Sequence, residues 1–139
     1  MVNHIGRIGC TTGKNMLIVP VTYVFEGDSI YGYSLNGTKV NMMRKNPNVC
    51  FEVDMIDDLS NWRSVIVSGV YEELKSDAGH QKVRKLFDER ISPIRRGETL
   101  HPAREMGDPP RRIQKNQKPV VYRIRIQELT GRFEKSTDR

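Results

Sequence analysis

The segment Met16–Phe25 constrains the fold of this chain more than any other stretch of the sequence. It reads MLIVPVTYVF and is apolar apart from Pro20 and Thr22. A solvated strand alternates polar and apolar side chains, so this segment is expected to be buried on both faces or to belong to a small closed barrel. Because proline cannot donate a hydrogen bond to a neighbouring strand, Pro20 marks a sheet edge, a bulge or a place where something other than a strand lies alongside.

Five further segments are predicted to be strands, because they are rich in β-branched and aromatic residues or alternate between polar and apolar side chains. They are Ile5–Thr12, Ser29–Ser34, Val49–Met55, Trp62–Tyr71 and Pro119–Gln127. Most of the connections have the length of hairpins, which favours antiparallel pairing. We therefore predict a mainly β chain, a six-stranded antiparallel barrel with two helices.

The two helices follow from changes in periodicity. Thr38–Lys45 has apolar residues at helical spacing and is stopped by Asn46-Pro47-Asn48. Further along, Ser76-Asp77 provides a cap for a helix that runs to about Arg90. The expected buried stripe of this second helix consists of Val83, Leu86, Phe87 and Ile91, and its His80 is expected at the surface.

The positive charge of the chain is concentrated in one segment. The formal net charge is +6, and residues 90–118 contain eight basic and three acidic residues, a net +5. The part from 92 to 118 is rich in proline, arginine and glycine, and is predicted to be an insertion without regular structure. It is either a solvated polar loop or an electropositive lid that attracts an anionic ligand. Nucleic-acid binding is disfavoured, because no aromatic residue interrupts the basic segment as a stacking platform would.

Length and composition favour one cytoplasmic domain. The 139 residues match the usual size of a single domain, here 1–139, and 37% of them are hydrophobic, too many for a disordered chain. No membrane partner is expected, because no apolar run could cross a bilayer, and the first residues lack the apolar stretch of a signal peptide. Cys10 and Cys50 are expected to be free buried thiols, although a disulfide between them stays open. Dimerisation would stabilise a domain this small, because its own core is limited.

The segment from Tyr33 to Lys39 carries the clearest sign of a ligand site. A strand ends there, a turn containing Gly37 follows, and a helix begins at Thr38. The first amides of a helix are unpaired and carry partial positive charge, so they form an anion site. The hydroxyls of Ser34 and Thr38 and the ammonium of Lys39 would complete a phosphate cradle. In the alternative interpretation, Thr38 is an ordinary cap and Lys39 is an ordinary surface residue.

The order of the elements resembles that of a known family. An apolar strand containing VPV, a Gly-Asp turn, SIYGYS ahead of GTK, then RKNPNVCFEVD and WRSVIVSGVYEEL follow one another as in the flavin-binding split-barrel family. This is the superfamily of pyridoxamine 5'-phosphate oxidase, and the likeness is strongest to its branch of nitroimidazole-resistance proteins. It extends over residues 6–74 and 120–132. The fold that it implies is a six-stranded antiparallel split barrel of the FMN-binding type.

The resemblance also implies a set of cofactor-binding residues in three groups. They are Val19, Pro20, Val21, Thr22, Tyr33, Ser34, Thr38, Lys39, Trp62, Arg63 and Ser64. In the family, the strand that matches the first four lies along the flavin ring, and the next four surround the ribityl chain and the phosphate. The last three match a strand start that reaches the flavin, in many members from the other subunit. The implied cofactor is FMN, and the implied assembly is a homodimer with the cofactor at the subunit interface.

The activity implied by the resemblance is FMN-dependent electron transfer from a nicotinamide donor to a small oxidised acceptor, for example a nitro compound. Oxidation of pyridoxamine phosphate itself is not expected, because the oxidases proper carry basic residues where this chain has Val21 and Val40. The alternative is a flavin- or heme-binding carrier or sensor without turnover. The sequence nominates no catalytic acid or base, and its three histidines and two cysteines show no metal-ligand spacing.

Overall fold

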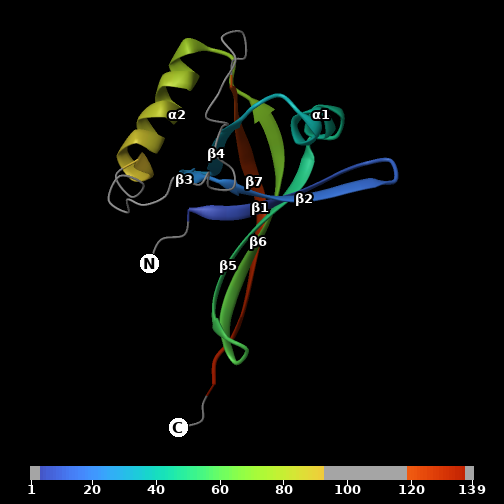
Figure 1. Cartoon of the computed structure of the whole chain (residues 1–139), viewed down its shortest axis with the longest axis vertical. Coiled ribbons are helices and arrows are strands. Elements are labelled where there is room, and N and C mark those ends of the chain that lie inside the picture. Colours follow the sequence, from blue (N-terminus) through green and yellow to red (C-terminus); the bar gives the residue numbers. More distant parts are fainter. Residues whose placement is uncertain (1–3, 93–118, 137–139) are drawn as a thin grey trace, which may run out of the picture.

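The computed structural model describes residues 4–92 and 119–136 of the chain (Figure 1). The strands are β1 (Ile5–Thr12), β2 (Asn15–Thr22), β3 (Val24–Glu26), β4 (Ser29–Ser34), β5 (Asn48–Asp58), β6 (Asn61–Glu73) and β7 (Val120–Glu134). Helix α1 (Thr38–Lys45) follows β4, and helix α2 (Asp77–Arg90) follows β6. The prediction of a mainly β fold with two helices is confirmed. The predicted basic insertion lies, from residue 93 to 118, outside the described residues.

The seven strands form one sheet in the order β2-β1-β5-β6-β7-β4-β3, and all neighbouring pairs are antiparallel. Although β2 and β3 follow one another in the chain, they form the two opposite edges of the sheet. Tyr23 links them, and its backbone N–H donates to the carbonyl oxygen of His4 at 3.0 Å. Over the described residues the ladder does not close, so the arrangement is an open split barrel and the predicted closed barrel is wrong. The predicted count of six strands is also wrong, because Met16–Phe25 divides into two strands with different partners.

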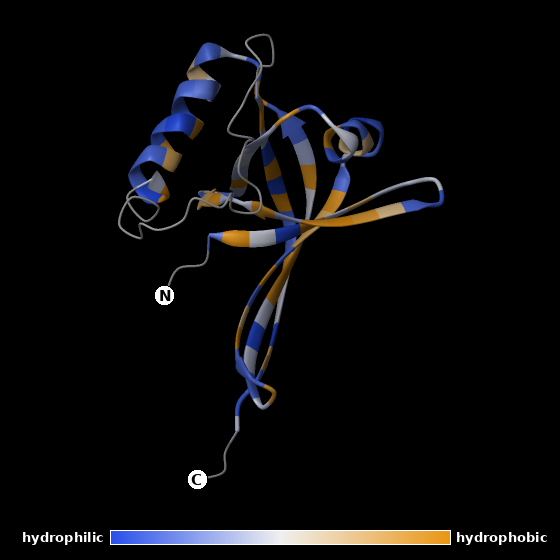
Figure 2. Ribbon diagram, in the orientation of Figure 1, coloured by the Kyte–Doolittle hydropathy of each residue, from blue (hydrophilic) through white to orange (hydrophobic). Residues whose placement is uncertain are grey.

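The apolar segment is buried only from Val21 to Val24. Val21 is 2% exposed, whereas Met16 and Ile18 are 80% and 74% exposed. The β1–β2 hairpin projects beyond the rest of the sheet, and apolar residues follow one another along β2 (Figure 2). Burial of the whole segment on both faces was therefore a wrong expectation. Pro20, opposite Arg7, lies in an edge strand, which confirms one of the three interpretations of this proline.

Helix α1 is held by the larger of two apolar clusters. Its Met42 and Met43 pack with residues such as Ile8, Phe51 and Tyr122, which come from β1, β5 and β7. Phe51 also meets Tyr23 edge to face, with the ring centroids 5.0 Å apart. This cluster fixes α1 against the strands that surround it.

Helix α2 covers β3, β4 and the start of β7 through the second cluster. The predicted stripe of Val83, Leu86, Phe87 and Ile91 is buried there, which confirms the prediction. The predicted cap is also confirmed, because the hydroxyl of Ser76 accepts the N–H of Gly79 at 3.0 Å. His80 is half-buried instead of lying at the surface, with its Nε2 2.7 Å from the carbonyl oxygen of Leu74.

Strands β5, β6 and β7 continue past the core as a three-stranded arm (Figure 1). Strand β7 runs to Glu134, well past its predicted end at Gln127. The β6–β7 register shifts at Gly69, where a Cβ atom would lie 2.6 Å from the carbonyl oxygen of Arg125. The two backbones therefore approach each other too closely for any residue with a side chain.

Candidate functional site

The β4–α1 corner, residues 34–39, is the start of a helix without a side-chain cap. Gly37 is the N-cap of α1, and no side chain accepts a hydrogen bond at that end of the helix. The first turn contains no acidic residue. Ser34, the last residue of β4, donates its hydroxyl to the carbonyl oxygen of Leu35 at 3.0 Å. The interpretation of Thr38 as an ordinary cap is therefore wrong, and the partly positive amides of the first turn face the corner.

Lys39 is not an ordinary surface residue, because its side chain is half-buried beside Cys10 of β1. Burial lowers the pKa of the Lys39 ammonium, and the nearby Cys10 thiol partly offsets that shift. Burial likewise raises the pKa of the Cys10 thiol, against the opposite influence of Lys39. None of the ion pairs between described residues includes Lys39. A partly desolvated ammonium of this kind favours an anionic partner.

The β2 residues Val19–Thr22 lie over the apolar cluster that also holds α1. Val21 belongs to that cluster together with Met42 and Met43, and Val19 packs against it. Thr22 is buried as well. The structure thus joins the β2 group and the second half of α1 through one shared core.

Tyr33 does not share the corner with Ser34, because adjacent residues of a strand point to opposite faces. Its ring packs on Phe87 of α2, with the centroids 4.7 Å apart. There it lines a small cavity of about 240 Å³, together with His80 and Arg84. Among the eight predicted residues on β2, β4 and α1, Tyr33 is therefore the one that packs against α2.

Trp62, Arg63 and Ser64 lie at the far end of the arm from α1 (Figure 1). The indole Nε1 of Trp62 donates to Oε1 of Glu134 at 2.9 Å. Nη2 of Arg63 donates to the thioether sulfur of Met55 at 2.9 Å. Trp62 and Arg63 also line a cavity of about 360 Å³. Within one chain, these residues are not brought to the β4–α1 corner.

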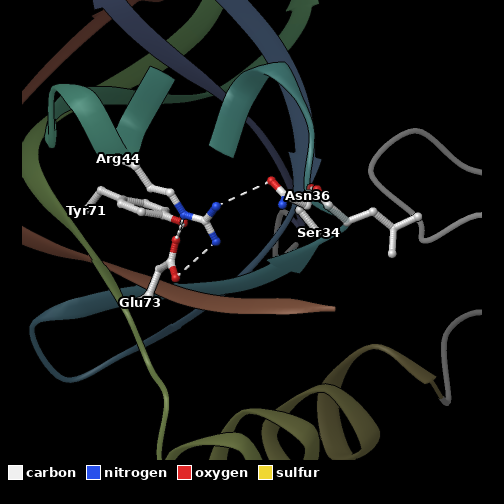
Figure 3. A network of polar contacts seen from close by, with 6 residues as sticks. Ser34, Asn36, Arg44, Tyr71 and Glu73 are labelled. Carbon is white, nitrogen blue, oxygen red and sulfur yellow. Dashed lines mark hydrogen bonds and ion pairs between the residues drawn. The ribbon is translucent and has the colours of Figure 1, made fainter. Parts of the chain in front are cut away.

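A polar network beside the corner was not predicted from the sequence (Figure 3). Arg44, in the last turn of α1, donates to both carboxylate oxygens of Glu73 at 2.5 and 3.4 Å. Its Nη1 lies 3.5 Å from Oδ1 of Asn36, which belongs to the corner. The hydroxyl of Tyr71 donates to the same carboxylate at 3.0 Å. The only signal in the sequence was a basic residue at a helix C-terminus, and that pattern does not indicate its partner.

Other candidate groups do not gather into a second centre. Across residues 4–92 and 119–136, no three His, Cys, Asp or Glu side chains come together as a metal site would require. Both cysteines are free, but Cys50 is exposed, so the expectation of two buried thiols is wrong for this one. Neither of the two described helices is long and apolar enough to cross a membrane.

An open antiparallel split barrel with an uncapped helix start defines a class of proteins, and comparison with known families identifies it. The pyridoxamine 5'-phosphate oxidase family model matches residues 2–133. Because this match covers nearly the whole chain, the protein belongs to that family, and the predicted family is confirmed.

Individual relatives place the chain more closely. An uncharacterised protein of Rhizobium meliloti (strain 1021) is 33% identical over 81 residues, which are 57% of this chain and 54% of that protein. The chain therefore matches only about half the length of this curated relative. The crystal structure of a FAD-binding protein from Mesorhizobium loti has a TM-score of 0.70 at 26% identity, over 96% of this chain and 87% of that one.

A more distant structure shares the fold alone. It is a candidate 5-nitroimidazole antibiotic resistance protein from Bacteroides thetaiotaomicron, with a TM-score of 0.65. Its sequence is 16% identical, and the superposition covers 92% of this chain and 75% of that one.

Proposed function

We propose that this chain binds FMN at the β4–α1 corner and works as a homodimeric oxidoreductase. It passes electrons from a nicotinamide donor to a small oxidised acceptor, for example a nitro compound. The observation that carries the proposal is the uncapped start of α1 beside the half-buried Lys39. Family membership and the likeness to the FAD-binding protein of Mesorhizobium loti support a flavin as the ligand. When bound, the flavin supplies the redox chemistry, while the protein binds and orients it.

The corner fits a mononucleotide phosphate. It offers one helix start, one ammonium and the hydroxyl of Thr38, which together suit a single phosphate group. The hydroxyl of Ser34 would join them by turning away from the carbonyl oxygen of Leu35. The corner is also open, because the heavy atom nearest to a Cβ position at Gly37 is the carbonyl oxygen of Leu35, 4.0 Å away. FAD would bring a second phosphate without a second cation among residues 34–39. These features favour FMN over FAD.

A homodimer accounts for the position of Trp62, Arg63 and Ser64. These residues lie on the arm, at the end opposite α1, so they can meet a flavin at the β4–α1 corner only from another copy of the chain (Figure 1). Apolar side chains on the same arm are exposed, with Leu59 92% and Phe133 78% exposed. Exposed apolar surface of this kind is typical of protein interfaces.

The absorbance spectrum of the purified protein tests the proposal. We expect a flavin spectrum that bleaches with a nicotinamide donor and returns when a nitro compound is added. In titrations of the flavin-free protein, FMN should bind more tightly than FAD and riboflavin. Tighter binding of FAD would contradict the choice of FMN. Bound flavin that never cycles, or a Soret-type heme band, would instead indicate a carrier or sensor module.

A further inference from the structure

A cavity of about 450 Å³ opens on the inner face of the β5–β6 hairpin. We call it the inner cavity, and its wall includes three directly opposed residue pairs of the β5–β6 ladder. These pairs are Phe51 with Val67, Val53 with Val65, and Met55 with Arg63. The first pair is buried and the second is half-buried, while the third ends in the exposed Arg63. The cavity is therefore apolar at its floor and cationic at its mouth.

The opposite wall adds apolar surface and a second cation. Tyr23, Phe25 and Ile30 line it from the β2–β4 region. Arg90 of α2 also lines the cavity, donating to the carbonyl oxygen of Phe25 at 2.7 Å and pairing with Glu26. Among the described residues that line the cavity, none has a carboxylate. The charge at this site is therefore positive.

Two of the four acidic residues of β5, Glu52 and Asp54, lie on the other face of the sheet and are already paired. Glu52 and Asp54 alternate with the cavity residues of β5, and both bind Arg7, at 3.1 and 3.0 Å. Ser64, which alternates with the cavity residues of β6, donates to Glu52 at 3.0 Å. The alternation of the two strands thus separates Glu52 and Asp54 from Arg63. Asp57 and Glu134 line a neighbouring cavity together with Arg63, but neither forms an ion pair with it.

Arg63 is the cation of the inner cavity that no described carboxylate neutralises. None of the ion pairs between residues 4–92 and 119–136 includes it. Its guanidinium donates to the thioether sulfur of Met55, which is a weak acceptor. A carboxylate would be a much stronger partner for this guanidinium, because the two groups match in charge and in geometry.

We propose that the inner cavity is a binding site for an apolar carboxylate. The hydrocarbon or aromatic body lies against Phe51 and Val67 at the floor, and the carboxylate pairs with Arg63 at the mouth. The volume lies within the usual range for small-molecule sites, about 300 to 1,000 Å³. This proposal does not rest on flavin binding, since no residue of the β4–α1 corner lines the cavity. Arg63 is shared with the proposed flavin site, which it would reach on the other subunit, so the test is made on flavin-free protein.

The test uses the flavin-free full chain and 2-naphthoate as the probe, with the neutral 2-naphthalenemethanol beside it. We expect 2-naphthoate to bind with one molecule per chain by calorimetry. Arg63→Gln should weaken it about tenfold, the loss of one charge-assisted hydrogen bond, and leave the alcohol unchanged. Arg132→Gln is the matched control, because Arg132 lies opposite Ser64 on the other face of the same arm. This variant should bind 2-naphthoate with the same affinity as the wild type.

A second variant and a second measurement locate the bound probe. Val53→Phe should fill the cavity and abolish binding of both probes. If this variant does not fold, nuclear Overhauser contacts from 2-naphthoate to the methyl groups of Val53, Val65 and Val67 in the wild type replace it. Equal affinity for acid and alcohol, an unchanged Arg63→Gln variant, or contacts elsewhere would overturn the proposal. A separate FMN titration of the wild type decides on the flavin proposal, so the two failures can be distinguished.

Discussion

The guanidinium of Arg44 and the carboxylate of Glu73 connect α1 to the end of β6. Nε and Nη2 of Arg44 donate to the two carboxylate oxygens of Glu73 at 2.5 and 3.4 Å. Nη1 of Arg44 lies 3.5 Å from Oδ1 of Asn36 in the β4–α1 corner. Helix, strand and corner loop are thus tied at one point (Figure 3). The Arg44 hydrogen bond is the largest of the influences that hold the pKa of Glu73 below its ordinary value of 4.5, and the Tyr71 hydrogen bond acts in the same direction.

This lowered pKa predicts how stability depends on pH. A carboxyl whose pKa is depressed by folding stabilises the folded state above its unfolded pKa, and this contribution is lost as the pH falls through the folded pKa. Between about pH 5 and pH 3, the free energy of unfolding should therefore fall more steeply for the wild type than for Glu73→Gln. Urea titrations at several pH values across that range measure the free energy of unfolding of both proteins. Glu89→Gln, on the exposed face of α2, should follow the wild type, and parallel curves for Glu73→Gln would contradict the prediction.

Lys39→Ala should weaken the binding of FMN by about tenfold or more and that of riboflavin by much less. Only FMN carries the phosphate that the ammonium would meet. Fluorescence titrations of the flavin-free protein with both ligands measure the difference. Lys45→Ala, a basic residue in the last turn of the same helix, is the control and should change neither affinity. An equal loss of affinity for both flavins would exclude Lys39 from a phosphate site.

Gly37→Asp should stabilise the protein and weaken FMN binding at once. An aspartate at the N-cap accepts hydrogen bonds from the first-turn amides and interacts well with the helix dipole, a gain of roughly 0.5 kcal/mol. The backbone at Gly37 is extended and the space is open, so the new side chain fits there. Its carboxylate would occupy the amides that the phosphate needs. Denaturation and FMN titration of the same sample check both effects, and unchanged FMN affinity would count against a phosphate at α1.

Mixing two inactive variants tests the shared site. In the proposed homodimer, Lys39 and Arg63 reach one flavin from different subunits. Lys39→Ala and Arg63→Ala homodimers should each bind FMN poorly. Subunit exchange between them should restore one intact site per mixed dimer, so up to half of the mixed sites regain wild-type affinity. If no affinity returns although mass spectrometry detects mixed dimers, each site belongs to a single chain.

Gly69→Ala should destabilise the fold by about 1 to 3 kcal/mol, because its new methyl group would meet backbone atoms that cannot move aside. The Cβ would lie 2.6 Å from the carbonyl oxygen of Arg125. Gly131→Ala is the matched control on the partner strand, since its Cβ would make an ordinary contact of 3.7 Å with Ser64. Urea denaturation should separate the two variants clearly. Equal stability would mean that the strands can part at Gly69 without loss.

The parts of the fold that could be predicted are those fixed by neighbouring residues. Helix α2 has its cap at Ser76 and its apolar stripe within three turns, so the signal is local and both features were found. Helix α1 was found for the same reason. Which strands pair is decided over long distances in the sequence. The division of Met16–Phe25 at Tyr23 could not be predicted, because both halves are apolar and only their partners differ.

The same difference between local and long-range features applies to the candidate site. The uncapped corner could be predicted, since a glycine, a helix start and Lys39 follow one another in the chain. The partnership of Arg44 with Glu73 could not be predicted, because it joins residues from separate elements through side-chain atoms. The inner cavity was missed for a related reason. Its wall depends on the register that places Met55 opposite Arg63, and that register includes a shift between Ile56 and Asp58 that the alternation of side chains does not reveal.

Pro20 has a consequence for solubility. Within the described part of the chain, β2 is an edge strand with exposed apolar side chains such as Met16 and Ile18. An edge strand of this kind is a template onto which further chains can add, as they do in fibres. The proline takes one donor away from that template, so an incoming chain cannot extend a regular cross-β ladder along it. We therefore expect Pro20 to oppose aggregation at this edge of the sheet.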